Sequence, residues 1–311
     1  MRVNNAPDQI DLDITVEEQH SGTSTVAVGY SQSGGVTYQL GLSQTNFMGT
    51  GNRVSIDLSR SDTIDYYNFN IYDPYFTIDG VSRGYNIYYR KTKLDEDRNV
   101  SNYVTDSLGG SVTFGYPLDE NQSISATLNV DDTKVTTGPW VSTYVRDYLL
   151  KNGGKTTHTS LYCDGSTANQ GTDTNPNWVC VDDFGNPKDL TEYGDRFEGD
   201  FLTYNLNLSW AYNTLNRPMF PTSGIYHRIG AEIALPGSDV EYQKITYEGQ
   251  AYFPLWKDFV LRGYTKLGYG NDLPFYKNFY AGGYGSVRGY DVSSLGPRYP
   301  SVTFDETSRN D

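Results

Sequence analysis

The sequence predicts an all-β protein, an antiparallel transmembrane β-barrel, on three observations. The chain is polar on average, with a mean hydropathy of −0.59, yet it contains 28 tyrosines and 32 glycines in 311 residues. Apolar and polar residues alternate along many segments, and these are longer than the usual five or six residues of a soluble strand. A tilted membrane strand needs about 9–11 residues. Only alternate residues of such a strand must be apolar, so average hydropathy does not reveal the membrane.

Composition and charge exclude several other classes of protein. The 24 basic and 38 acidic residues give a net charge of −14, which argues against a nucleic-acid binder with a dominant basic face. Hydrophobic residues make up 37% of the chain, and no apolar run approaches the roughly 18 residues of a membrane helix. The 13 Phe, 28 Tyr and 4 Trp are too many aromatic residues for an intrinsically disordered chain.

The alternation divides the chain into a short opening segment and a longer series of strands. In Asp8–Glu17, four aliphatic residues alternate with acidic and polar ones, which predicts a strand with one buried face. From residue 23 onward the pattern predicts eleven strands separated by turn residues. The alternation is clear in Gly35–Asn46, Gln122–Asp131 and Phe201–Tyr212.

The connections between these strands predict which side of the membrane each one faces. Counted along the chain, the two longest are the seventh and the eleventh connections, Asp132–Gly199 and the segment from Asn271 onward. All odd-numbered connections lie on the same side of an antiparallel barrel. Outer-membrane barrels have long extracellular loops and short periplasmic turns. We therefore expect the odd set outside. Aromatic residues gather near the opposite strand ends, as in an interfacial girdle: Tyr75, Phe76, Tyr116, Trp210, Tyr212, Phe253 and Trp256.

An odd number of strands predicts that part of the barrel is missing. Closed barrels of the bacterial outer membrane have an even number of strands. The chain ends in a polar segment, Thr307–Asp311, with no terminal strand, and Met1 is not followed by a signal peptide. We therefore expect a fragment of a larger, exported protein that lacks about five strands; the alternative is that the count of eleven is wrong.

The two cysteines, Cys163 and Cys180, lie in the long loop among Gly, Asn, Asp and Thr residues. In an oxidising compartment they are expected to form a disulfide that closes part of this loop. The alternatives are two free thiols or half of a metal site, although no nearby histidine or third cysteine completes one. The same loop is rich in acidic residues, including Asp182 and Asp183, which favour a solvated surface over a calcium site.

The sequence contains no recognisable enzyme motif. The three histidines, His20, His158 and His227, have no zinc-binding spacing, and no nucleophile elbow or phosphate loop is present. We therefore predict no enzymatic activity, no cofactor and no metal.

The most informative stretch is a glycine-rich loop, residues 275–290, which reads FYKNFYAGGYGSVRGY. Gly282, Gly283 and Gly285 would let the backbone turn tightly and place Arg288. An arginine inside a barrel needs carboxylate or carbonyl partners, because its charge is permanent and its fork is geometrically demanding. The alternative is an ordinary flexible loop with an incidental arginine.

This stretch closely resembles the sixth extracellular loop of the BamA family of outer-membrane assembly factors, through Val287, Arg288, Gly289 and Tyr290. Residues 46–52, 70–82 and 220–224 are also similar to that family. The resemblance implies periplasmic POTRA domains followed by a 16-stranded barrel. Residues 1–20 would then end the last POTRA domain, and residues 21–311 would form a partial barrel. That part would include the long fourth loop, 132–199, and the start of the sixth, 271–311.

The resemblance also implies a function, which is the folding and insertion of nascent β-barrel proteins without nucleotide. The first barrel strand would pair weakly with the last and open sideways, so that a substrate strand adds to its free edge. Its residues form the expected gate strand: Thr23, Thr25, Val26, Val28 and Tyr30. Without the resemblance, this segment is simply another wall strand.

The implied partners are unfolded outer-membrane β-barrel substrates, outer-membrane lipids and, through the POTRA domains, accessory lipoproteins, with no nucleic acid. The implied location is the outer membrane. Translocation and assembly module barrels and two-partner secretion transporters share the Arg-Gly-aromatic loop, but the long fourth loop favours the BamA family. A passive channel or surface receptor is the alternative from another class. The usual partners of Arg288 would lie beyond Asp311, so Arg288 is expected to be solvent-exposed or poorly paired in this chain.

Overall fold

The computed structural model describes residues 15, 20–31, 35–93, 103–137, 141–157, 166–169, 178–181, 196–257, 259–283, 286–290 and 295–296. Of residues 166–169 and 178–181, only the backbone is described. The expected POTRA strand at Asp8–Glu17 lies outside these residues except for Thr15. No helix among the described residues is long and apolar enough to cross a membrane.

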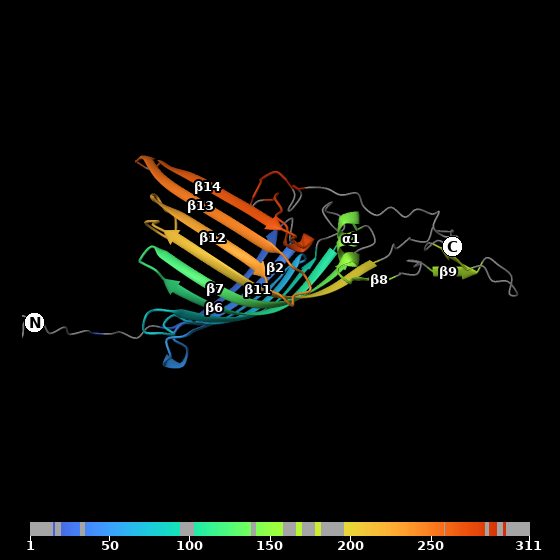
Figure 1. The fold of residues 1–311 in the computed structure, drawn as a ribbon, viewed down its shortest axis with the longest axis horizontal. Coiled ribbons are helices and arrows are strands. Elements are labelled where there is room, and N and C mark those ends of the chain that lie inside the picture. Colours follow the sequence, from blue (N-terminus) through green and yellow to red (C-terminus); the bar gives the residue numbers. More distant parts are fainter. Residues whose placement is uncertain are drawn as a thin grey trace, which may run out of the picture.

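One curved antiparallel sheet forms the wall of the molecule (Figure 1). Eleven strands follow one another in chain order, which confirms the predicted number and topology. They are β1 (Gly22–Ser31), β2 (Gly35–Gln44), β3 (Arg53–Arg60), β4 (Ile64–Asp73), β5 (Ser82–Lys93), β6 (Tyr103–Pro117), β7 (Gln122–Thr137), β11 (Arg196–Asn213), β12 (Gly224–Ala234), β13 (Gln243–Trp256) and β14 (Phe259–Asn271).

Shorter elements lie in the connections. The β2–β3 turn contains the 3-10 helix η1 (Phe47–Gly49). The connection between β7 and β11 contains helix α1 (Thr143–Lys151) and strand β8 (Lys155–Thr157), which pairs with β11. Strands β9 (Ser166–Asn169) and β10 (Trp178–Val181) form a separate two-stranded sheet, and the 3-10 helix η3 (Phe275–Lys277) follows β14.

Strands β7 and β11 extend further into the predicted fourth loop than its expected bounds, 132–199. Residues 132–137 continue β7, and Arg196 already begins β11. The two strands stay paired there, with Phe201 opposite Thr133 and Glu198 opposite Thr136. Their outward residues are charged, so the apolar alternation stops although the backbone ladder continues.

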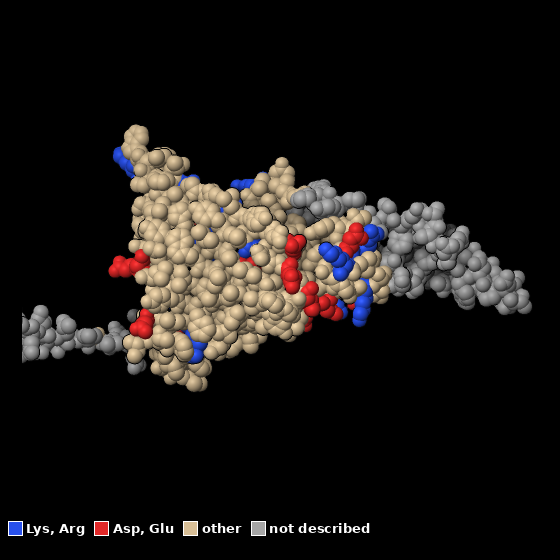
Figure 2. Space-filling model, viewed as in Figure 1, with Lys and Arg blue, Asp and Glu red and all other residues tan. Residues whose placement is uncertain are grey.

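Cross-strand rows show that the two faces of the sheet differ in chemistry. One row on the convex face joins Val26, Leu40, Leu58, Tyr67 and Tyr89 through successive strand pairs. The neighbouring row on the concave face joins Thr25, Gly41, Asp57, Asn68 and Tyr88. In Figure 2, the surface over the strands is almost free of charged side chains, which gather mainly towards the end near α1. An apolar outer face and a polar inner face are typical of a membrane barrel wall.

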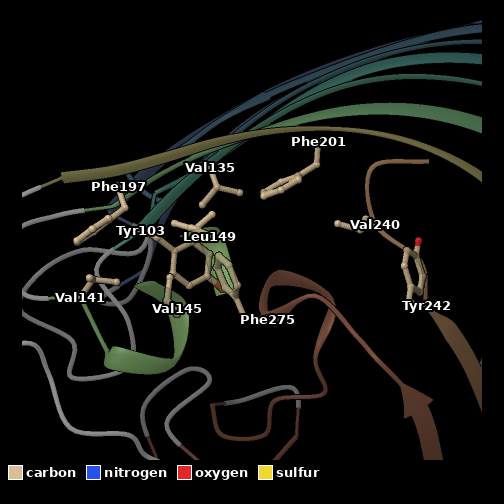
Figure 3. Packing of buried hydrophobic residues seen from close by; sticks show 10 residues of the cluster. All are labelled: Tyr103, Val135, Val141, Val145, Leu149, Phe197, Phe201, Val240, Tyr242 and Phe275. Carbon is tan, nitrogen blue, oxygen red and sulfur yellow. The ribbon is translucent and has the colours of Figure 1, made fainter. Parts of the chain in front are cut away.

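The buried core lies on the concave side, at the end of the sheet that carries α1 (Figure 3). Inward residues of β6, β7 and β11 pack against α1, the β12–β13 connection and η3. The cluster comprises Tyr103, Val135, Val141, Val145, Leu149, Phe197, Phe201, Val240, Tyr242 and Phe275. Helix α1 begins after Ser142, whose side chain accepts a hydrogen bond from the backbone N–H of Val145. These loops therefore form an inner plug against the wall.

The sheet is open in this chain, and β1 and β14 are its two edges. All ten residues of β1 are in register with β2, from Gly22 opposite Gln44 to Ser31 opposite Gly35. At the other edge, β14 pairs with β13, with one irregularity between Pro254 and Trp256.

Candidate functional site

The segment that follows β14 turns inward and packs inside the curved wall. The side chain of Phe275 is 1% exposed and meets Tyr103 and Tyr148 edge-on, with ring centroids 4.8 and 5.5 Å apart. The start of the expected sixth loop is therefore anchored to the wall and to α1.

A second, polar anchor lies at the end of η3. The ammonium group of Lys277 donates to the Glu232 carboxylate and to the Tyr242 hydroxyl, at 2.7 Å in each case. The Tyr242 hydroxyl donates to the same Glu232 oxygen at 2.5 Å. Glu232 is on β12 and Tyr242 directly precedes β13, so these three residues, the Lys277 latch, tie the loop to the inner wall.

The latch is largely buried. The side chains of Lys277 and Glu232 are only 19% and 23% exposed. Burial, together with the charge of Glu232 and the hydrogen bond to it, raises the pKa of Tyr242 well above its ordinary value. Tyr242 therefore remains a neutral donor over the whole physiological range. The latch combines a charge-assisted pair with a neutral hydroxyl, an arrangement that satisfies a buried carboxylate.

Lys244 and Gly268 contact the residues just beyond the latch. The ammonium group of Lys244, on β13, donates to the backbone carbonyl of Lys277 at 2.9 Å and lies 4.6 Å from the ring centre of Phe279. The Phe279 ring lies over Gly268 of β14, where a Cβ would come within 2.4 Å of a ring carbon. Glycine at 268 therefore makes room for the loop at this point.

The motif residues lie in a loop that hydrogen bonds close at its base. Ala281 forms an isolated bridge with Leu295, and the backbone N–H of Gly283 donates to the carbonyl of Tyr290 at 2.9 Å. Gly282, Gly283 and Gly289 have φ angles of 115°, 88° and 92°, in the region that favours glycine. Gly282 and Gly283 are two of the predicted loop glycines, whereas the third, Gly285, lies outside the described residues.

The Val287–Tyr290 motif is exposed. Arg288 is one of these exposed residues, and its role stays a prediction. The expected gate strand is at the other edge of the open sheet: Val26, Val28 and Tyr30 face outward and are 77%, 69% and 78% exposed. Thr23 and Thr25 alternate with them and face inward.

The remaining sequence predictions lie partly outside the described residues. Cys163 is one of the residues that are not described, and Cys180 lies in β10 opposite Thr167, so the disulfide stays a prediction. Within the described residues, no group of three or more His, Cys, Asp or Glu side chains is placed to hold a metal ion.

The Lys277 latch was not predicted from the sequence. Lys277 lies in the glycine-rich stretch 275–290, but the sequence predicted no role for it. A signal was available in β12, where Glu232 is a charged residue at an inward position of a membrane strand. Such residues are costly, and they mark paired or functional positions.

Comparison with known proteins identifies the family. A model of the Omp85 superfamily domain matches residues 46–308. The outer membrane protein assembly factor BamA of Neisseria meningitidis is 31% identical over 299 residues, which cover 94% of this chain and 33% of that protein. BamA of Nitratidesulfovibrio vulgaris is 23% identical over 304 residues, with 94% and 31% covered. The chain thus spans about a third of the length of these relatives.

A solved structure shows the same fold. The crystal structure of BamA from Haemophilus ducreyi lacking POTRA domains 1–3 superposes with a TM-score of 0.72 at 28% identity. The match covers 94% of this chain and 49% of that one.

Proposed function

Because the chain belongs to the Omp85 superfamily and is an outer-membrane β-barrel, we propose that it forms the first eleven strands of an assembly factor that inserts β-barrel proteins. Its substrates would be unfolded outer-membrane proteins. Accessory lipoproteins would bind through POTRA domains in the complete protein. The α1 end of the sheet would face the cell exterior, because it carries the long connections.

The observation that supports this proposal best is the match to BamA proteins in sequence and in fold over 94% of the chain. By that likeness β1, with its outward apolar side chains, would be the strand at the seam. In lipid, an unpaired backbone N–H or C=O is costly, so an edge that opens would be a strong template for an incoming strand. Main-chain hydrogen bonds would bind the substrate, and no nucleotide would be required.

The wall and loop contacts complete the proposed mechanism. A barrel that opens at one seam needs the rest of its wall to stay paired, and ten consecutive strand pairs link β1 to β14. The Lys277 latch and the Phe275 contacts would hold the sixth loop inside the barrel during that opening.

A photo-crosslinking experiment in the full-length protein tests the templating edge. A photoreactive amino acid at Val28 should capture a translocating barrel substrate. The same group at Ile87, an outward residue of the doubly paired strand β5, is the matched control. Equal substrate capture from Val28 and Ile87 would contradict templating at β1, and a passive channel would give no capture at either position.

A further inference from the structure

A charged residue on the lipid-facing side of the wall stands out. Arg83, near the start of β5, is the cross-strand partner of Phe114, an outward residue of β6. Its guanidinium carbon lies 3.8 Å from the ring centre of Phe76 and 5.3 Å from that of Tyr85. These aromatic residues lie at the short-turn end of the barrel, where the membrane meets water. An arginine there is held in place by ring faces.

The guanidinium has donors to spare. Its nearest acid is Asp73, and the Nη2–Oδ2 distance is 3.7 Å, longer than a hydrogen bond. Within the described residues its Nε atom is buried and has no hydrogen-bond partner, so the Nη groups are the donors that face outward. Asp73 accepts instead from the backbone N–H of Tyr75 at 3.2 Å. Both charged side chains remain partly accessible, at 29% and 23% exposure. The result is a loosely joined cation and anion side by side at the membrane surface.

An apolar groove begins at Phe114, the cross-strand partner of Arg83. The cross-strand row that contains Arg83 and Phe114 continues through Ala126, Leu208 and Ala231. The next row towards the turns contains Tyr116, Ile124 and Trp210. Small alanine side chains among these large ones leave a groove of about 510 Å³, within the range of about 300–1,000 Å³ for small-molecule sites.

We propose that Arg83, Asp73 and this groove bind one glycerophospholipid with a phosphoethanolamine head group. The phosphate would pair with Arg83, the ammonium with Asp73, and one acyl chain would lie in the groove. Charge complementarity favours this head group, because the protein offers one cation and one anion, as the zwitterion does. The groove continues the outward apolar face that lipid already covers, so an acyl chain is its natural occupant.

Native mass spectrometry of the full-length protein tests the proposal. Protein in detergent is mixed with equal amounts of phosphatidylethanolamine, phosphatidylglycerol and diacylglycerol of matched chains, and the retained lipids are counted. Wild type should prefer phosphatidylethanolamine. Arg83→Gln should retain it on the order of tenfold less well, the scale of one charge-assisted contact. Asp73→Asn should shift the preference to phosphatidylglycerol.

Control variants separate this site from general effects. Arg90→Gln removes another β5 arginine that lies over a ring, that of Tyr66, but on the inner face, and it should leave lipid retention unchanged. Ala126→Leu should fill the groove and lower retention. The proposal is overturned if wild type retains diacylglycerol or phosphatidylglycerol equally well, or if inorganic phosphate displaces the lipid. It also fails if Arg90→Gln matches Arg83→Gln, or if Ala126→Leu has no effect. The wild-type comparison decides the head group even if a variant fails to fold.

Discussion

Replacing Lys277 with methionine should release the start of the sixth loop from the inner wall. The substitution keeps most of the side-chain volume but removes the ammonium group that Glu232 and the Tyr242 hydroxyl contact. Breaking a buried ion pair by deleting one partner costs about 3–5 kcal/mol, whereas an exposed pair is worth about 0–1 kcal/mol. The Lys277 and Glu232 side chains are about one-fifth exposed, and Tyr242 still donates to Glu232. We therefore expect a cost of about 3 kcal/mol, the lower end of the range for a buried pair.

A cost of about 3 kcal/mol corresponds to roughly a hundredfold change in the equilibrium between the docked and released loop. Hydrogen exchange measures that equilibrium at the backbone amides of Lys277 and Asn278, which donate to Pro274 and Phe275 at 2.8 and 3.3 Å. Exchange at these amides should accelerate by about that factor in Lys277→Met. It should slow again in the double variant Lys277→Met/Glu232→Gln, because a neutral amide then replaces the carboxylate that lost its partner.

Lys266→Met provides the matched control, since Lys266 is an inward lysine of β14 opposite Glu248 and outside the latch. Its exchange at residues 277 and 278 should equal that of wild type. Unchanged exchange in Lys277→Met would refute the reasoning. So would a double variant that exchanges faster than the single one.

Four further predictions concern the loops and the orientation of the barrel. Gly268→Leu should displace the Phe279 ring and expose residues 279–283 to protease, whereas Gly263→Leu, where a Cβ meets nothing within 4 Å, should not. An engineered cysteine at Thr156 should react with an impermeant reagent on intact cells, and cysteines at Asp119 and Thr222 should not; labelling at 119 would invert the assigned orientation. Peptide mass spectrometry without reduction should find Cys163 bonded to Cys180, a link worth about 3 kcal/mol in the loop-entropy model. Arg288→Ala and Arg288→Lys should both lower assembly activity in the full-length protein, because a point charge cannot copy the guanidinium fork; full complementation by either would argue against a role for that fork.

The strand number and order could be predicted from sequence because membrane strands obey a local rule. Each spanning residue faces either lipid or the lumen, so the pattern repeats every two residues whatever the neighbouring strands contain. The rule stops where the strand leaves the membrane. At Asp132 and Lys134 the outward face is charged, and the alternation no longer distinguishes strand from loop, although β7 continues to Thr137. The predicted fourth loop was therefore too long at both ends.

The Lys277 latch could not be predicted in the same way. Lys277 and Glu232 are 45 residues apart, and their contact depends on the path of the loop after β14 as well as on the register of β12 and β13. Alternation shows that Glu232 faces the lumen, but it does not show which cation enters that lumen. Arg288, the residue that motif resemblance emphasised, lies eleven positions beyond the latch and is exposed in this chain.

The two anchors of the sixth loop differ in kind, and this difference suggests how each one acts. Phe275 is held by apolar packing against Tyr103 and Tyr148, contacts that tolerate small movements of the rings because dispersion is not directional. Lys277 is held by hydrogen bonds to two fixed oxygens of the wall, which weaken steeply when the geometry changes. Glu232 lies on β12, so a shift of that strand relative to the loop would strain the latch before it affected the Phe275 contacts. The apolar anchor therefore keeps the loop inside the wall, while the polar anchor sets its register against β12 and β13.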